Sequence, residues 1–183
     1  MKVADPGTNP CQTLPDFIKH IRSINLGVIL HYARRYDEAI DAFRHTLELD
    51  RNNSFAQIQL GSAYAAKGIY AEAIAAYQEA IKLGEDTPRT QILLGTAFAK
   101  AGERAKAQEI LKRLQSGSDY VSPTGLAVLQ AALGERKQAF ASLEKAYTSH
   151  DLQLQYLSVD PALDSLRSDP HFAELVRRVG LPE

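Results

Sequence analysis

Apolar residues recur at helical spacing along most of the chain, and the pattern itself repeats. In three successive segments a Leu-Gly pair is followed by a large apolar residue, then by an Ala with another large apolar residue four positions later. The Leu-Gly pairs begin at Leu26, Leu60 and Leu94, which are 34 residues apart. Recurrence every three to four residues predicts amphipathic helices, and two fit in each segment. A fixed period of this length indicates stacked helix pairs.

Small residues stand where the two helices of each segment would cross. The first helix carries Gly27, Gly61, Gly95 or Ala127, and the second carries Ala39, Ala73, Ala107 or Ala139. Large apolar residues one turn away would fill the space around each crossing. The fourth segment is the most divergent, because Gln130 replaces the large apolar residue and the last step shortens to 32 residues.

Glycines also mark the end of three of the four first helices. Gly68, Gly102 and Gly134 stand where a tight helix–helix turn needs the left-handed backbone conformation. The first segment has Arg34 at this position. We therefore expect mild backbone strain at Arg34.

These residues resemble the signature of the tetratricopeptide (TPR) family, L-G-x-x-Y followed by A-x-x-x-F, most closely in the first two copies. The resemblance covers about residues 20–150 and implies an all-α fold, a right-handed α-α superhelix. Residues 16–151 would form four TPR-like helix pairs, at about 20–53, 54–87, 88–119 and 120–151.

The two ends of the chain break the period. Residues 1–15 contain Pro6, Gly7 and Pro10 among polar residues and read as a flexible lead-in. In residues 152–183, Asp160 and Asp169 each precede a proline, the pattern of a helix N-cap. We expect this tail to form C-terminal capping helices that cover the last apolar face of the array. It also resembles the closing segment of repeat arrays in bacterial multidomain regulators.

Composition limits the classes of partner. The 183 residues are 45% hydrophobic and 23% charged, with 21 basic and 22 acidic residues and a net charge of −1. Binding to nucleic acid or to an anionic membrane would need a basic excess, so neither is expected. No apolar run approaches the roughly 18 residues that span a bilayer. A single cysteine, Cys11, excludes an intrachain disulfide and favours a cytoplasmic location.

No catalytic or metal-binding pattern is found. The glycines of Gly61–Gly68 resemble a phosphate loop, but no Ser or Thr follows Lys67. Asp50–Ser54 resembles the start of a calcium loop but lacks its glycine and its bidentate glutamate. The five histidines have no metal-ligand spacing. We expect no enzyme activity, no catalytic residue, no metal and no cofactor.

The first helices would line the concave surface of the superhelix, which is the expected partner-binding groove. A 3-4-3 spacing on their free face, with a few residues that break the repeat pattern, selects its candidates: Ile24, Val28, His31, Tyr32, Phe55, Ile58, Ser62, Arg89, Ile92, Thr96, Lys100 and Val128. This face is mostly apolar with few charges. It therefore favours an apolar or amphipathic peptide or helix as partner, although packing between neighbouring repeats explains many of the same positions.

Two other interpretations bear on the partner. TPR domains that clamp acidic chaperone tails use Lys, Asn and Arg on this face, and here only Arg89 fits, so such tails are disfavoured. The alternative to a scaffold is a self-association or regulatory module of a larger bacterial signalling or transcriptional system. The partner is expected to be a protein or peptide, and a homo-oligomer stays open.

Overall fold

The computed structural model describes residues 14–181, with side chains from Arg22 onward. Most of the expected lead-in, including Cys11, lies outside the described residues. The elements in chain order are α1 (Leu14–Tyr32), α2 (Tyr36–Leu49), α3 (Ser54–Lys67), α4 (Tyr70–Lys82), α5 (Pro88–Lys100), α6 (Arg104–Ser116), α7 (Pro123–Ala132), α8 (Arg136–Thr148), two 3₁₀ helices η1 (Leu152–Tyr156) and η2 (Pro161–Leu166), and α9 (Pro170–Val179). Pro15 is the second residue of α1, a position in the first helical turn where proline is tolerated.

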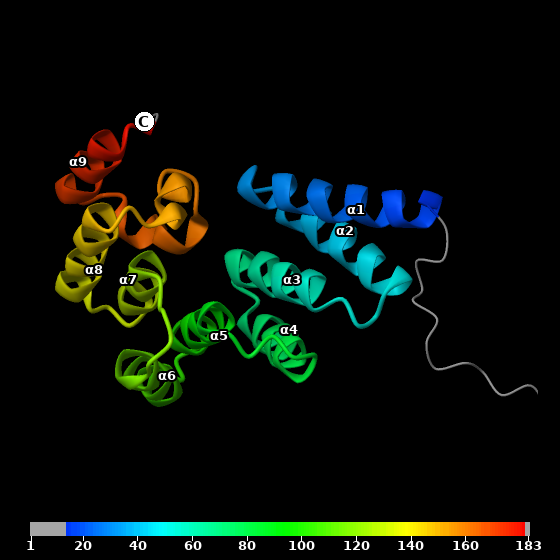
Figure 1. The fold of residues 1–183 in the computed structure, drawn as a ribbon, viewed down its shortest axis with the longest axis horizontal. Coiled ribbons are helices and arrows are strands. Elements are labelled where there is room, and N and C mark those ends of the chain that lie inside the picture. The colour runs from blue at the N-terminus through cyan, green and yellow to red at the C-terminus, as the bar shows by residue number, and fades with distance from the viewer. Residues whose placement is uncertain (1–13, 182–183) are drawn as a thin grey trace, which may run out of the picture.

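Helices α1 to α8 form four consecutive helix pairs, and residues 14–181 contain no β-strand. The pairs stack into an all-α, right-handed superhelix that curves along the chain (Figure 1). The curve is strong enough to bring the C-terminal end of α1 close to the tail, which is drawn in orange. The predicted fold class is therefore confirmed.

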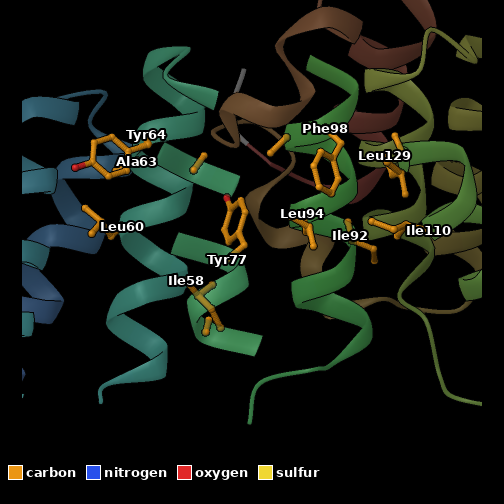
Figure 2. Packing of buried hydrophobic residues seen from close by; sticks show 14 of the residues in the cluster. Ile58, Leu60, Ala63, Tyr64, Tyr77, Ile92, Leu94, Phe98, Ile110 and Leu129 are labelled. Carbon is orange, nitrogen blue, oxygen red and sulfur yellow. The ribbon is translucent and has the colours of Figure 1, made fainter. Parts of the chain in front are cut away.

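One apolar core runs through the stacked pairs. It extends from Leu30 of α1 to Leu133 after α7 without a break. Figure 2 shows the stretch of this core from α3 to α7, where side chains of neighbouring pairs meet. Tyr77 of α4 and Phe43 of α2, two of the residues predicted to fill the helix crossings, are at most 1% exposed.

The turns inside the pairs have the predicted backbone. Gly68, Gly102 and Gly134 have φ values of +83°, +86° and +77°. Arg34 adopts the same left-handed conformation, with φ of +61°. The expectation of strain in the first turn is therefore confirmed, since a side chain disfavours positive φ.

The tail packs against the last helix pair. Leu154, Leu157, Leu163 and Leu166 are buried in a second apolar cluster with residues of α7, α8 and α9. The side chains of Asp160 and Asp169 accept hydrogen bonds from the backbone N–H groups of Ala162 and His171, at 2.9 and 3.1 Å. Both predicted N-caps are present, although the first starts a 3₁₀ helix. The segment caps the solenoid because it covers the apolar face of the fourth pair.

Candidate partner-binding groove

A groove of about 820 Å³ lies between the first helices of the four pairs and the tail. Its walls come from α1, α3, α5 and α7, which are the first helices of the four pairs. The tail closes a further side with residues of η1 and η2. Residues from all four pairs and from the cap therefore share one cavity.

Ten of the twelve candidate residues line this groove: Val28, His31, Tyr32, Phe55, Ser62, Arg89, Ile92, Thr96, Lys100 and Val128. Ile24 and Ile58 are not among its lining residues. Ile58 is only 6% exposed and belongs to the continuous core, so at this position the sequence pattern reflects repeat packing. Ile92 and Val128 line the groove, but they are only 5% and 6% exposed.

Aromatic rings concentrate at the end of the groove formed by the first pair and the tail. Tyr32 stacks on Tyr156 of η1, with ring centroids 5.2 Å apart and planes inclined by 6°. The His31 ring lies nearly perpendicular to that of Tyr32 and is tilted by 56° to that of Tyr36, at centroid distances of 5.2 and 5.8 Å. Burial and the neighbouring Asp160 carboxylate raise the pKa of Tyr32. Tyr32 is therefore neutral and can present both a ring face and a hydroxyl.

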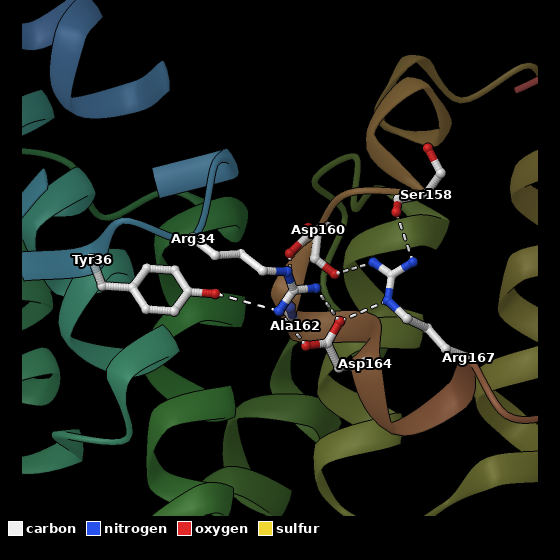
Figure 3. Close-up of polar contacts among 7 residues, drawn as sticks. All are labelled: Arg34, Tyr36, Ser158, Asp160, Ala162, Asp164 and Arg167. Carbon is white, nitrogen blue, oxygen red and sulfur yellow. Dashed lines mark hydrogen bonds and ion pairs between the residues drawn. The ribbon is translucent and has the colours of Figure 1, made fainter. Parts of the chain in front are cut away.

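Charged groups also reach the groove, which is less apolar than the sequence pattern suggested. Arg34 and Asp164 form a bidentate ion pair with two N–O distances of 2.8 Å (Figure 3). The hydrogen bonds from Arg34 lower the pKa of Asp164 to about 2. Burial raises the pKa of Asp160, which also lines the groove. These added charges come from the tail and from the turn after α1, which contribute to the wall in addition to the first helices.

Three lining residues carry buried polar atoms that have no hydrogen-bond partner. They are His31 Nδ1, Thr96 Oγ1 and Thr124 Oγ1, and they are the three such side-chain atoms among the described residues. Burial, and to a lesser extent the nearby Arg34, lowers the pKa of His31 to about 4, so its ring is neutral at pH 7. Buried polar groups are normally paired, because an unmade hydrogen bond is costly. All three residues line the groove, but the atoms themselves are buried behind its open surface.

Among the described residues, no cluster of three or more His, Cys, Asp or Glu side chains could hold a metal ion. Within the same part of the chain, no helix is both long and apolar enough to cross a bilayer.

The sequence pattern did not reveal the groove residues outside the first helices. Arg34, Tyr156, Asp160 and Asp164 all line it. The one available signal was Arg34, an arginine at a position where the other pairs have glycine. No signal connected it to Asp164, since the two residues are 130 positions apart.

Comparison with known families settles the class of the repeats. A family model described as "Tetratricopeptide repeat" matches residues 23–53, and one described as "TPR repeat" matches residues 61–102. The first match covers the second half of α1 and all of α2, and the other runs from the middle of α3 to just past the end of α5. The chain is a tetratricopeptide-repeat protein. Its TPR repeats support a role as a protein-interaction scaffold. No curated protein sequence matches this TPR protein.

Solved structures resemble the TPR protein in fold. A chain of the APC/C hetero-tetramer Cut9-Hcn1 is 18% identical with a TM-score of 0.62, and the match covers 92% of this chain and 34% of that one. YrrB, described as a TPR protein with an unusual peptide-binding site, is 19% identical with a TM-score of 0.53, covering 93% and 98% of the two chains. MamA is 21% identical with a TM-score of 0.51, covering 88% and 92%. The TPR protein thus spans about a third of the Cut9-Hcn1 chain that it matches.

Proposed function

We propose that this TPR protein is a scaffold that holds an amphipathic peptide segment of a protein partner in its concave groove. The observation that carries the proposal is the single cavity of about 820 Å³ to which all four helix pairs and the tail contribute. Concave surfaces of helical solenoids serve as extended binding sites because successive repeats present side chains along one face. The resemblance to YrrB, whose description names a peptide-binding site, agrees with this proposal.

The size of the groove limits the length of the bound segment. A helix about 10–12 Å wide with a pitch of about 5.4 Å occupies roughly 400–600 Å³ per turn. The groove therefore accommodates between one and two turns, or about four to seven residues. The rest of a longer partner would extend beyond the groove.

The chemistry of the wall favours an amphipathic segment in an extended conformation. Val28 and Phe55 supply apolar surface, and Phe55 remains 42% exposed. His31, Thr96 and Thr124 carry polar atoms that are buried and unpaired, so a ligand would pair them only after these side chains rotate. A helix satisfies its own main-chain hydrogen bonds, whereas an extended segment brings free N–H and C=O groups to the wall. An extended peptide would therefore pair groups that a helix leaves unpaired.

The test is a selection of binders from a library of random eight-residue peptides, followed by measurement of Kd by fluorescence anisotropy. We expect Phe55→Ala to weaken binding about tenfold, because it removes a large apolar contact. Leu152→Ala is the matched control, since Leu152 is 82% exposed and does not line the groove. Binders that respond equally to both substitutions would show that the groove is not the site.

A second variant separates the two peptide conformations. Thr96→Val keeps the shape of the side chain but removes the hydroxyl. It should weaken an extended peptide severalfold while leaving the stability of the free protein unchanged or higher, because an unpaired hydroxyl is lost. Unchanged affinity would favour a helical ligand instead.

Self-association is the second candidate function. Leu26 and Ile29 on α1 are 52% and 66% exposed and lie three residues apart, on one helical face. Such a face suits contact with a second copy of the chain. Sedimentation equilibrium tests this directly: a dimer that Ile29→Asp dissociates supports the candidate, and a monomer at all concentrations rules it out.

A further inference from the structure

The first helix pair departs from the other three at one backbone position. The other pairs use Gly68, Gly102 and Gly134 for the left-handed turn, and the first uses Arg34 with φ of +61°. Glycine would adopt this conformation without strain. Strain that a simple substitution would relieve points to a role for the side chain itself.

The Arg34 side chain bridges the first pair and the tail. Its two terminal nitrogens lie 2.8 Å from the two carboxylate oxygens of Asp164 in η2 (Figure 3). Asp164 is held in place from its own side, because Arg167 donates to it at 2.7 Å. Arg167 also donates to the backbone oxygens of Ser158 and Asp160, at 2.7 and 3.0 Å. The arginine therefore meets a preorganised acceptor.

A second contact accompanies the ion pair. Tyr32, two residues before Arg34, stacks on Tyr156 of η1 with ring centroids 5.2 Å apart. The groove lining includes both members of the ion pair, Arg34 and Asp164, and both stacked rings, Tyr32 and Tyr156. The first pair and the tail thus meet directly at the rim of the cavity, across about 130 positions of the chain.

These contacts differ in kind from those that anchor the tail. The tail is fixed to the last pair by buried leucines such as Leu157 and Leu163, which are 0% and 1% exposed. That apolar cluster contains no residue of α1 or α2. By contrast, the side chains of Arg34 and Asp164 are 48% and 43% exposed. Ion pairs between such groups are weak and are screened by salt.

We propose that Arg34–Asp164 and Tyr32–Tyr156 form a clasp that closes the groove between the first helix pair and the tail, and that the clasp opens to admit the partner. In a solenoid each repeat contacts chiefly its neighbours, so the first pair can swing away from the tail without loss of the core. The tail stays on the last pair, because its leucines remain buried there. The admission of a partner rests on the proposed function, whereas the opening itself is a property of the free protein.

The experiment measures the opening without any partner. Nitroxide labels are placed on Asp41→Cys in α2 and Glu174→Cys in α9, both exposed positions outside the clasp, in a chain with Cys11→Ser. Pulsed electron–electron double resonance then gives the distribution of distances between the label on the first pair and the label on the tail. We expect Arg34→Gly to raise the long-distance population by about tenfold, the effect of losing one bidentate pair and loosening one ring stack.

Two comparisons identify the cause of any change. Arg35→Ala removes the same charge from the neighbouring arginine, which pairs locally with Glu38, and should leave the distances unchanged. Sodium chloride at about 1 M should open the parent protein and have little further effect on Arg34→Gly. Arg34→Gly should fold normally, because glycine occupies this turn in the other pairs.

The clasp and the peptide-binding proposal fail separately. Identical distance distributions for the parent protein and Arg34→Gly, at low and high salt, would overturn the clasp whatever the groove binds. If the distances change as expected, a library-selected groove peptide should associate several times faster with Arg34→Gly. An unchanged association rate would mean that the clasp opens but does not control access, which would refute that part of the proposal.

Discussion

Gly61 lies where α3 crosses α4, and its replacement by alanine tests why the repeat keeps glycine there. A Cβ atom at Gly61 would lie 2.7 Å from Cε1 and 2.8 Å from Cδ1 of Tyr77. Tyr77 is 1% exposed, and its hydroxyl donates to Ser62 Oγ at 3.2 Å. The ring is therefore confined by packing and by a hydrogen bond, so it cannot move aside cheaply.

Two opposing effects set the magnitude for Gly61→Ala. Alanine in a helix interior is favoured over glycine by about 1 kcal/mol. Forcing an extra carbon into a filled core costs about 1–3 kcal/mol. Contacts under 3 Å with a confined ring place this site toward the upper end of that range. We therefore expect a net loss of about 1–2 kcal/mol in the free energy of unfolding.

The matched control is Gly95→Ala, at the equivalent position of the next repeat. There the added Cβ would lie 3.1 Å from Leu129 Cδ1 and 3.2 Å from Ile110 Cγ2, so these neighbours need to shift by only a few tenths of an ångström. This variant should be neutral or up to about 1 kcal/mol more stable. Urea unfolding followed by circular dichroism compares the two variants with the parent protein. If Gly61→Ala matched Gly95→Ala in stability, the packing argument would be refuted.

Two further predictions concern the polar groups of the structure. Asp151 accepts hydrogen bonds from Ser122 Oγ at 2.6 Å and from the backbone N–H groups of Thr124 and Gln153, both at 3.0 Å, so one carboxylate caps the starts of α7 and η1. Asp151→Ala should lower the free energy of unfolding by about 2–3 kcal/mol in urea titration, and a loss below about 0.5 kcal/mol would contradict this role. His31 has its pKa lowered from 6.5 to about 4 by burial, so the unfolded chain binds the proton more readily and stability should fall as the pH drops from about 6.5 to 4. The loss attributable to His31 is up to about 3 kcal/mol, and His31→Gln should remove it; parallel stability–pH profiles for the two proteins would exclude this assignment.

Local sequence chemistry determined the repeat and its internal geometry. The spacing of Leu26, Leu60 and Leu94 predicts the helix pairs. The glycines at 68, 102 and 134 predict the left-handed turns, because this conformation depends on a single residue and its immediate neighbours. The prolines after Asp160 and Asp169 predict the two caps for the same reason. The turns and the caps are each decided within about one or two helical turns of the residue that causes them.

The candidate groove was predicted only in part, because helical spacing cannot separate two kinds of inward-facing residue. Phe55 and Ile58 lie three residues apart in α3, yet Phe55 is 42% exposed in the groove and Ile58 is 6% exposed in the core. The choice depends on the angle at which the next helix pair stacks, which places a neighbouring helix over one residue and leaves the other uncovered.

Only the tertiary structure decided where the two ends of the array meet. Arg34 could be identified from the sequence as an exception to the glycine pattern, but its partner Asp164 could not. The distance between them results from the rotations between successive pairs, added over the whole superhelix. A repeating pattern specifies each step through local packing, and a small change in every step would move the tail away from α1. The pairs and turns were therefore determined by the sequence pattern, whereas the closure of the groove and the charges at its rim depend on the accumulated curvature.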